Sequence, residues 1–509
     1  MKHSEMQRAV LGRLQAWLVA GTETRQLGVT VLLCLIVGVA GGALFALLGP
    51  ILAVAVLVAF VSGLAMLRST QLTLFALVAF ICLLPFAALP VPDIGFSPTF
   101  LDLVLAVLLF SWLFQLATKK KRHLRTSALG VPIVIFMGLA CASFVIGLSF
   151  GSLTTNLLRQ FAELLLNIFL FFLVLNNVES REQLQQILAV LIVAGLAVAV
   201  IGLVLYYLPP DWTIRLLSML RIFRYPAGSG VLRYIEENPD LPLRATSTSI
   251  DPNVLGGMLA IVAATAAPQL LAKDPLPLLR RRARRWGVNW ALVPVLAIIV
   301  MCLLLTYSRA AMGGLAVAVL AIGLLRYRKL LMVILLAGLV MLVLPQTQWY
   351  LQRSLEGLRG EDLATRMRFG EYKDALVLIA RYPWFGVGFA GAPDIDTYLG
   401  VSSIYLLIAE QMGLIGLVVF LWINALAIRQ ILRWLGSQGN STPLEPTVLG
   451  LFAGLLAALS SGVLDHYFVN LKFQHAVALF WLCLGLAIRA TQLSERGDNA
   501  DVRARTAAP

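Results

Sequence analysis

The chain has 509 residues, of which 60% are hydrophobic and only 13% are charged, with a net charge of +14. A soluble domain usually carries about 25% charged residues, so this chain cannot cover itself with a water-facing surface. Apolar runs of about 20 residues, long enough to cross a hydrocarbon core of ~30 Å, recur from Leu27 to Ile488. The composition predicts an all-α polytopic membrane protein. It excludes a soluble enzyme, a nucleic-acid-binding protein and a disulfide scaffold.

The apolar runs predict about fourteen transmembrane helices, or twelve crossings with a re-entrant piece. In chain order the predicted spans are 27–48, 51–67, 72–89, 100–117, 128–149, 157–176, 184–208, 252–272, 288–307, 310–325, 329–345, 402–428, 447–465 and 472–489. Residues 1–26 are basic and amphipathic, and we expect them to lie as a helix on the cytoplasmic face. The membrane domain then covers residues 27–489, and the polar tail, 490–509, is predicted to be disordered.

Basic residues test this topology. Alternation from a cytoplasmic N-terminus places the three dense basic runs, 119–125, 280–285 and 326–329, on the cytoplasmic side. The positive-inside rule requires this placement, and it leaves both termini in the cytoplasm. Two long extracytoplasmic loops result, 209–251 and 346–400. Short helices are predicted in both, over 212–225 and 362–381, and the second ends before Pro383.

Arginine is frequent on the predicted extracytoplasmic face, against the usual bias. The residues are Arg215, Arg221, Arg224, Arg233, Arg244, Arg309, Arg366 and Arg368. A guanidinium group binds phosphate oxygens in pairs and keeps its charge, so the set suggests a lipid-linked phosphate or pyrophosphate. The alternative is contact with lipid headgroups, which suits the first three best. Arg309 is a stronger candidate for phosphate binding because it interrupts an otherwise apolar run. The alternative is that it sits at a tight turn and extends its side chain to the membrane surface.

Other polar residues lie within or beside the predicted spans. Arg159 and Glu163 are four residues apart in the sixth span, where they form either a self-neutralising pair or part of a site. Glu410, in the twelfth span, is either partnered or a proton carrier. His466 and His475 lie at the outer ends of the last two spans. Imidazole is the side chain best suited to move a proton near neutral pH, and a structural interfacial histidine is the alternative for each.

Signals for metals and cofactors are weak. The sequence has no GxxxxGK[ST] and no HExxH pattern, and its five cysteines lie in apolar runs without a CxxC spacing. Asp394 and Asp396 have the DxD form that some glycosyltransferases use to hold a metal–nucleotide pair, but two loop carboxylates occur readily by chance. We expect neither a metal nor another cofactor.

Four local patterns together resemble the O-antigen ligase/polymerase superfamily of membrane glycosyltransferases. They are RATSTSIDPNVLGG at 244–257, TYSRAAMGG at 306–314, RFGEYKDALVLIARYPWFGVG at 368–388 and YLLIAEQMGLIGLVVF at 405–420. Each is weak alone. Their order, their spacing and their placement around one large outer loop make the combination specific.

The resemblance implies a fold similar to GT-C glycosyltransferases in the bacterial inner membrane. It also implies transfer of a glycan, without metal, from an undecaprenyl-pyrophosphate donor to a glycan, lipid or protein acceptor, by a polymerase or a ligase. The family's two pyrophosphate-binding arginines correspond to Arg309 and Arg368. Further candidates for donor binding are Arg244 and Arg366, and other candidate site residues are Asp251, Asn253, Arg159, Glu163 and Tyr405.

The family's loop histidine has no counterpart here. Its His-Asn pair before the tyrosine-leucine reads Ser402-Ser403, and a serine hydroxyl cannot act as a general base near neutral pH. The candidates for that role, in order, are His466, His475 and Glu410, followed by Asp251, Asp394 and Asp396, or no protein base at all.

A polysaccharide or lipid transporter is the alternative function. Transporters place polar residues near the midplane and often have related halves. In this sequence the polar groups concentrate at one face and no half-to-half symmetry is visible, so the glycosyltransferase is the preferred hypothesis.

Overall fold

The computed structural model describes residues 60–89, 95–118, 124–272, 284–285, 288–328, 331–332, 359–360, 363–391, 400–437 and 442–506, with a few isolated positions before residue 60. The chain divides into two compact units, residues 1–69 and 70–509. In the first unit, residues 60–68 are helical, within the predicted second span. The predicted amphipathic segment 1–26 lies outside the described residues, as do most of the predicted spans 27–48 and 329–345.

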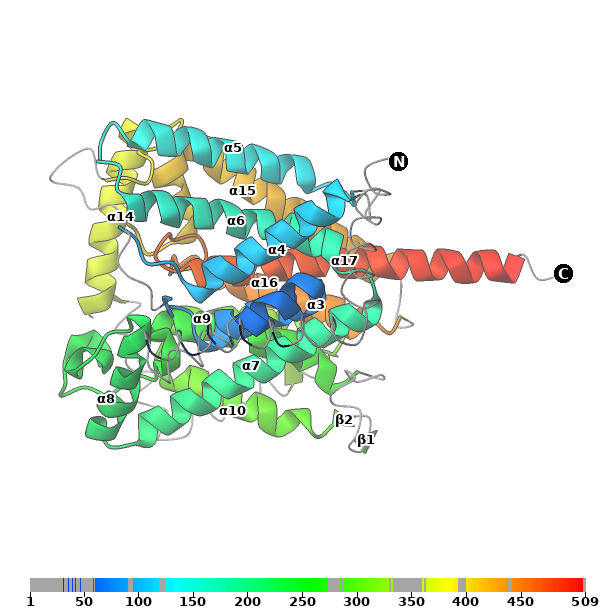
Figure 1. Ribbon diagram of the computed structural model, residues 1–509, viewed down its shortest axis with the longest axis horizontal. Coiled ribbons are helices and arrows are strands. Elements are labelled where there is room, and N and C mark those ends of the chain that lie inside the picture. The colour runs from blue at the N-terminus through cyan, green and yellow to red at the C-terminus, as the bar shows by residue number, and fades with distance from the viewer. Residues whose placement is uncertain are drawn as a thin grey trace. The chain divides into compact units, whose positions relative to one another are not determined.

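Apolar helices make up the second unit (Figure 1). They are α3 (Thr70–Leu83), α4 (Phe100–Ala117), α5 (Gly130–Gly147), α6 (Thr155–Asn177), α7 (Arg181–Tyr207), α9 (Pro252–Ala266), α10 (Leu292–Leu305), α11 (Arg309–Leu325), α15 (Ile404–Ser437), α16 (Glu445–Ser461) and α17 (Gln474–Thr506). Each falls on a predicted span. Across the described residues, seven helices are long and apolar enough to cross a membrane, and α3, α10, α11 and α16 are shorter apolar helices. The structure therefore confirms an all-helical membrane protein, without establishing the predicted number of spans.

Polar side chains fix where several of these helices begin. Thr99 and Asp102 form a reciprocal capping box at the start of α4, and Thr154, Ser180 and Ser308 each accept a backbone N–H at the start of α6, α7 and α11. Each cap satisfies a backbone donor that the first helical turn leaves without a partner. The helix starts therefore follow from local sequence as well as from hydropathy.

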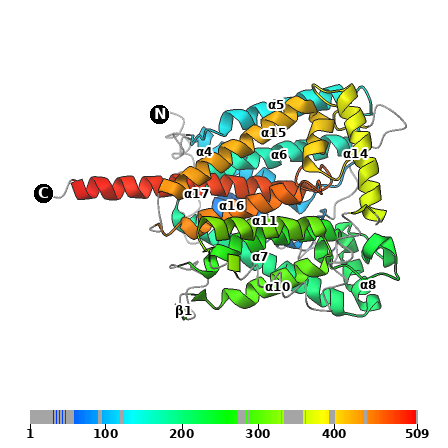
Figure 2. The ribbon, with the colours of Figure 1, turned by 180° about the vertical axis from the view of Figure 1, so that it is seen from behind.

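Small residues bring the helices of the core together. α11 packs on α16, α16 on α9, and α17 on α6 (Figures 1 and 2). A Cβ atom added at Gly314 of α11 would lie 2.5 Å from the carbonyl oxygen of Ala457, and one added at Gly450 of α16 would lie 2.3 Å from that of Thr265. Helix packing in membranes relies on such close backbone approaches because lipid supplies little hydrophobic driving force between helices.

Short elements gather at one end of the second unit, which we call the loop end. α8 (Pro210–Met219) and the 3-10 helices η1 (Leu220–Phe223), η2 (Ser229–Val231), η3 (Ile235–Glu237) and η4 (Ser247–Ser249) follow α7, and α14 (Leu363–Arg381) precedes α15. The 3-10 helix η5 (Ala267–Leu270) instead continues α9. The C-terminus of α17 and a hairpin of β1 (Arg284–Arg285) and β2 (Val288–Asn289) lie at the opposite end (Figure 1). The short helices predicted over 212–225 and 362–381 are confirmed.

Two helices extend further than hydropathy predicts. α15 continues from the predicted end at 428 to Ser437, and α17 continues to Thr506, through the segment predicted to be a disordered tail. Both extensions are rich in residues with high helix propensity, among them Leu, Arg, Gln, Glu and Ala. Loss of hydrophobicity marks the end of a membrane span, but it does not mark the end of a helix.

α15 is broken at Gly413, whose φ of 71° lies in the left-handed region. The segment 383–388 fits into the break. The N–H groups of Val387 and Gly388 donate to the carbonyls of Glu410 and Gln411, each at 2.9 Å, and the N–H of Leu414 donates to Pro383 at 2.7 Å. This segment, which we call the clamp loop, joins the end of α14 to the start of α15 and so positions both at the loop end.

Candidate functional site

Charged side chains from several segments meet at the loop end. Arg244 follows η3, Asp251 caps α9, Arg368 lies on α14, and Asp465 and His466 lie in the loop between α16 and α17. The Nη2 atom of Arg368 is 4.0 Å from Oδ2 of Asp465, which is only 5% exposed. We call these five residues the charged centre.

Arg244 is fixed in place by two hydrogen bonds. Its Nε donates to the carbonyl of Thr306 at 2.8 Å, and its Nη2 donates to Oδ1 of Asn253 at 2.6 Å. Burial lowers the pKa of the Arg244 guanidinium, while the nearby carboxylates of Asp251 and Asp465 raise it. An arginine keeps its proton under these conditions, so the centre contains a permanent, oriented positive charge.

Asp251 has a structural task that explains its position. Its Oδ1 accepts the N–H groups of Asn253 and Val254 at 2.8 and 3.1 Å and so caps α9. The segment 251–253 therefore starts the helix and, through Asn253, also orients Arg244. The structure brings these three residues of the first sequence pattern together.

Asp465 is the most buried carboxyl group of the centre. Burial raises its pKa to about 7, while the Arg368 guanidinium opposes that shift. Its Oδ1 accepts the backbone N–H of His466 at 3.0 Å, and within the described chain its Oδ2 accepts no hydrogen bond. Near neutral pH this carboxyl group is therefore poised between its charged and neutral forms beside Arg368.

His466 follows Asp465 without forming a side-chain dyad with it. The Nδ1 atom of His466 is 3.7 Å from Oδ1 of Asp465, too far for a hydrogen bond. Burial lowers the pKa of this imidazole, and the carboxylates of Glu371 and Asp251 oppose the shift. A lowered pKa keeps the ring neutral near pH 7, which is the form that accepts a proton.

Arg309 and Arg368 are both associated with α14. Arg309 begins α11, and its Nη2 donates to Oγ1 of Thr365, three residues before Arg368, at 3.4 Å. The structure therefore brings together the two arginines that the sequence singled out. Arg366, by contrast, is exposed and donates from Nε to the carbonyl of Gly360 at 3.3 Å.

Glu371 belongs to the site although sequence reasoning missed it. Its Oε2 accepts hydrogen bonds from the N–H and the Oγ of Ser402, at 3.0 and 2.6 Å. The hydroxyl of Tyr372 donates to the carbonyl of Ser402 at 3.2 Å. Ser402 is thus held against α14 by three contacts. Glu371 lies three residues after Arg368 and so on the same face of a helix, a spacing that could have found it.

Residues 294–421 match the family model described as O-antigen ligase. Over this stretch the chain is similar to the O-antigen ligase family. The matched stretch contains Arg309, Arg368, Glu371 and Ser402, whereas the remaining members of the charged centre, from 244–251 and 465–466, lie outside it and fold against it. No curated protein matches the chain.

This match confirms, over residues 294–421, the predicted resemblance to the O-antigen ligase/polymerase superfamily. The domain implies glycosyl transfer of the ligase or polymerase type, with lipid-linked glycans as substrates, in a membrane. That chemistry needs positive charge near a phosphate group and a place for an acceptor hydroxyl, and the charged centre offers the first.

Two predicted site residues of the ligase domain lie on α15. Glu410 is 1% exposed, its Oε1 accepts the N–H of Gly400 at 3.2 Å, and its Oε2 has no hydrogen bond among the described residues. The hydroxyl of Tyr405 donates to the carbonyl of Leu459 at 2.8 Å, so Tyr405 ties α15 to α16. Tyr405 has a structural contact, whereas Glu410 keeps one free acceptor.

Three more of the arginines predicted on the outer face have local partners. The Arg215 guanidinium lies 5.7 Å from the centroid of the Trp212 ring, and Arg233 pairs with Glu237 at 3.2 Å. Arg224 contacts Ser97. Neither Arg215 nor Arg233 is a member of the charged centre.

Arg159, Glu163 and His475 form a second group, separate from the charged centre. The Nη1 atom of Arg159 pairs with Glu163 at 2.9 Å, as the sequence predicts, and also with Asp102 at 2.8 Å, a partner that the sequence analysis missed. His475 lines the same pocket as Arg159 and Glu163. The Phe473 ring lies 6.0 Å from the ring of His466 and 6.5 Å from that of His475, so the two imidazoles have one neighbouring aromatic ring in common.

Metal ligands were sought in the parts of the chain that the structure describes. No group of three or more His, Cys, Asp or Glu side chains there could hold a metal ion. Asp394 and Asp396 lie outside the described residues. Cys82, Cys302 and Cys483 are buried and unpaired, as small core residues are.

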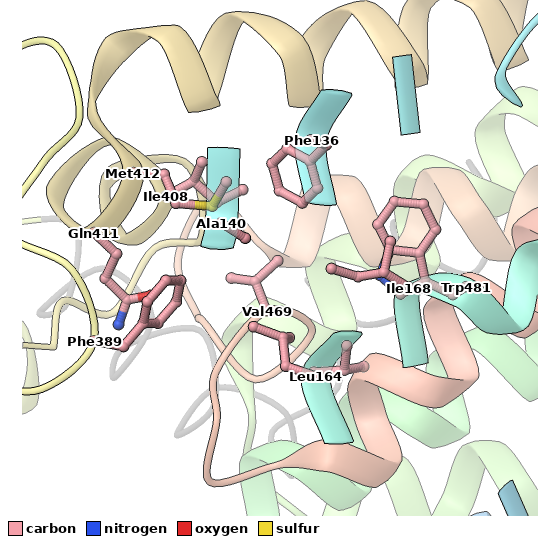
Figure 3. Close-up of a pocket in the computed structure, with 11 residues that line it drawn as sticks. Phe136, Ala140, Leu164, Ile168, Phe389, Ile408, Gln411, Met412, Val469 and Trp481 are labelled. Atoms are coloured by element: carbon pink, nitrogen blue, oxygen red, sulfur yellow. The ribbon is translucent and has the colours of Figure 1, made fainter. Parts of the chain in front are cut away.

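An apolar cavity lies deeper in the bundle, between α5, α6, α15 and α17 (Figure 3). It is small, with a volume of about 20 Å³, and its lining is apolar apart from the Gln411 amide and the indole N–H of Trp481. The Phe389 ring closes it on the clamp-loop side. With no titratable group in its walls, this cavity has no means to take part in acid–base or phosphate chemistry.

Proposed function

We propose that the protein transfers a glycan from an undecaprenyl-pyrophosphate donor to an acceptor hydroxyl at the extracytoplasmic face of the bacterial inner membrane. The observation that carries the proposal is the meeting of Arg309 and Arg368 at α14, with Arg244 nearby. The O-antigen ligase match supports the reaction class.

The arginines act on the leaving group. In the reaction the acceptor oxygen bonds to the anomeric carbon while the bond from that carbon to the pyrophosphate oxygen breaks, so negative charge develops on the pyrophosphate. Guanidinium groups held by Thr306, Asn253 and Thr365 are already oriented for this charge. Fixed charges in a water-poor site stabilise a transition state because they need no reorganisation. Transfer without a metal is part of the proposal.

His466 is the residue that we assign to take the acceptor proton. It lies beside Asp465 and near Arg368, and its lowered pKa favours the neutral ring. Glu410 is less suited because one of its oxygens holds Gly400, and His475 is turned toward a different pocket. In the proposed step, the imidazole accepts the hydroxyl proton as the glycosidic bond forms.

The proposed topology directs the loop end outward and leaves both termini in the cytoplasm. Residues 284–285, part of a dense basic run, lie at the opposite end of the unit from α8 and α14, which agrees with the positive-inside rule (Figure 1). The donor lipid tail then remains in the bilayer, while its glycan meets the charged centre from outside.

A transfer assay separates this function from lipid or polysaccharide transport. Full-length protein purified in detergent is incubated with the lipid-linked oligosaccharide of its own cells and with an acceptor. We expect a longer or transferred glycan together with free undecaprenyl pyrophosphate. A transporter makes neither product, since detergent removes the second compartment, and absence of both products would reject the glycosyltransferase.

A further inference from the structure

A polar pocket with a volume of about 350 Å³ opens at the loop end, apart from the apolar cavity. Its walls come from the segment between α3 and α4, from α6, and from the start of α17 with the loop before it. The lining residues that matter for its chemistry are Phe86, Gln160, Glu163, Arg224, Lys472 and His475. Neither the family match nor the proposed reaction assigns a ligand to this pocket.

Buried polar groups line this pocket. Arg159 is pinned between Asp102 and Glu163, and Glu163 is 3% exposed. His475 is 1% exposed, and neither ring nitrogen has a hydrogen-bond partner among the described residues. Buried polar atoms are normally hydrogen-bonded, and leaving one unmade costs about 1–3 kcal/mol. His475 therefore places two polar atoms without a protein partner beside the wall of this pocket.

The mixture of groups indicates which ligand. Arg224 and Lys472 supply donors, Glu163 supplies an acceptor, and Gln160 supplies both. Sugar hydroxyls donate and accept at once, so they satisfy such a mixed wall. A bare phosphate only accepts, and the buried Glu163 carboxyl group disfavours it. The Phe86 ring, 4.8 Å from the His475 ring, adds an apolar surface for the carbon face of a sugar.

The pocket adjoins the charged centre. Ile250, in its wall, precedes Asp251, and the charge of Lys472 acts on His466. The Phe473 ring lies next to both the His475 ring and the His466 ring. A sugar bound in this pocket thus lies next to the residue that accepts the hydroxyl proton.

We propose that this pocket binds the acceptor sugar and presents its hydroxyl to the charged centre. The inference rests on the proposed glycosyl transfer and adds the acceptor site to it. Arg309 and Arg368 then hold the donor on one side of His466, and the pocket holds the acceptor on the other.

Two variants test the pocket with little risk to folding. His475→Phe keeps an aromatic ring beside Phe86, although a slightly larger one, and removes the ring nitrogens. Lys472→Gln removes the charge of an exposed loop residue. The matched control is Arg221→Gln, an exposed outer cation near Arg224 that is not among the pocket's lining residues.

The acceptor probe is a set of lipid-free oligosaccharides of one to three repeat units, released by mild acid from the cell's own surface polysaccharide. Transfer rates are measured against acceptor concentration at fixed donor, and against donor at fixed acceptor. We expect the acceptor KM to rise about tenfold in each pocket variant, a loss of one good polar contact, with the donor KM unchanged. Arg221→Gln should match the wild type.

Direct binding of the same oligosaccharides, measured by calorimetry, separates the two proposals. If the wild type forms no product but binds the oligosaccharide, and His475→Phe weakens that binding, the sugar site is supported and the transfer reaction is wrong. If the wild type forms product and both pocket variants keep wild-type acceptor KM and binding, the acceptor site is overturned and the polar group serves only to join α4 and α6. Thermal unfolding confirms that both variants are folded.

Discussion

The charged centre and the apolar cavity occupy neighbouring parts of one bundle, and their walls come from adjacent residues. Glu410 lies at the loop end, whereas Gln411 and Met412 line the cavity (Figure 3). Asp465 belongs to the centre, whereas Val469, four residues later, lines the cavity. The presence of space therefore does not identify a site. What distinguishes the centre is a set of half-buried charged groups around the buried Asp465, with Arg244 and Asp251 oriented by hydrogen bonds.

This contrast predicts that the chemistry fails on changes at the centre, while the cavity affects only stability. The largest effect is expected for Arg368→Lys and Arg309→Lys. Lysine keeps the charge but loses the planar fork that binds two oxygens. Loss of one preorganised donor costs about 10²–10³ in rate, so we expect product formation to fall below detection.

The lysine variants are measured in the detergent assay, with Arg221→Lys as the matched control and with expression level and elution profile as checks of folding. Wild-type turnover in either variant would remove the pyrophosphate-binding role of that arginine.

A loss of similar size is expected for His466→Gln. General bases contribute about 10²–10⁴ in rate, and burial lowers the pKa of His466 below its usual 6.5. The acidic limb of the wild-type pH–rate profile should therefore lie below pH 6.5, where the ring becomes protonated. We expect His466→Gln to be slower and to lack this limb, and His475→Phe to keep it. An unchanged rate and limb in His466→Gln would direct attention to Glu410.

Changes in the apolar cavity should affect stability and leave activity unchanged. Ile168 lines it and is 1% exposed, so Ile168→Ala enlarges an already empty space. Such a change typically lowers the free energy of unfolding by about 2–5 kcal/mol. We expect a lower thermal midpoint with unchanged kcat and KM at a temperature where the variant is folded. A loss of kcat without a loss of stability would contradict the division between the two regions.

The smallest effect concerns the pH dependence of stability. Burial raises the pKa of Asp465 from 3.8 to about 7, so the native state holds this proton more tightly than the unfolded chain does. The resulting stabilisation is complete below pH 3.8 and is lost as the pH rises through about 7. Between pH 5 and 8 the thermal midpoint of the wild type should fall a few degrees more than that of Asp465→Asn. Parallel curves would show that the carboxyl group titrates normally.

Sequence alone located the apolar helices, because hydropathy is a local property. The meeting of Arg309 with α14 followed from the family resemblance, not from spacing. Asp102 was missed as a partner of Arg159 because the contact joins α4 to α6, and no local pattern reports a contact between helices. The helical tail after residue 490 was missed because low hydrophobicity was interpreted as disorder.

The Ser402–Glu371 contact is another contact that local sequence patterns cannot predict. The sequence shows a serine where the family has histidine, but only the fold shows that Glu371 holds that serine.

In the clamp loop, Pro383, Gly386 and Gly388 form the pattern P-x-x-G-x-G, and the packing of the loop explains its spacing. A Cβ atom at Gly386 would lie 2.4 Å from the carbonyl oxygen of Glu410, and one at Gly388 would lie 2.5 Å from the Cα atom of Gly147. The N–H groups of this loop satisfy carbonyls that the break at Gly413 would otherwise strand in the bundle. The spacing of this motif therefore sets the positions of the loop's N–H donors opposite the carbonyls of α15. One residue inserted between Pro383 and Gly388 would shift every donor past its acceptor, so homologous chains should vary in length on either side of this segment and never within it.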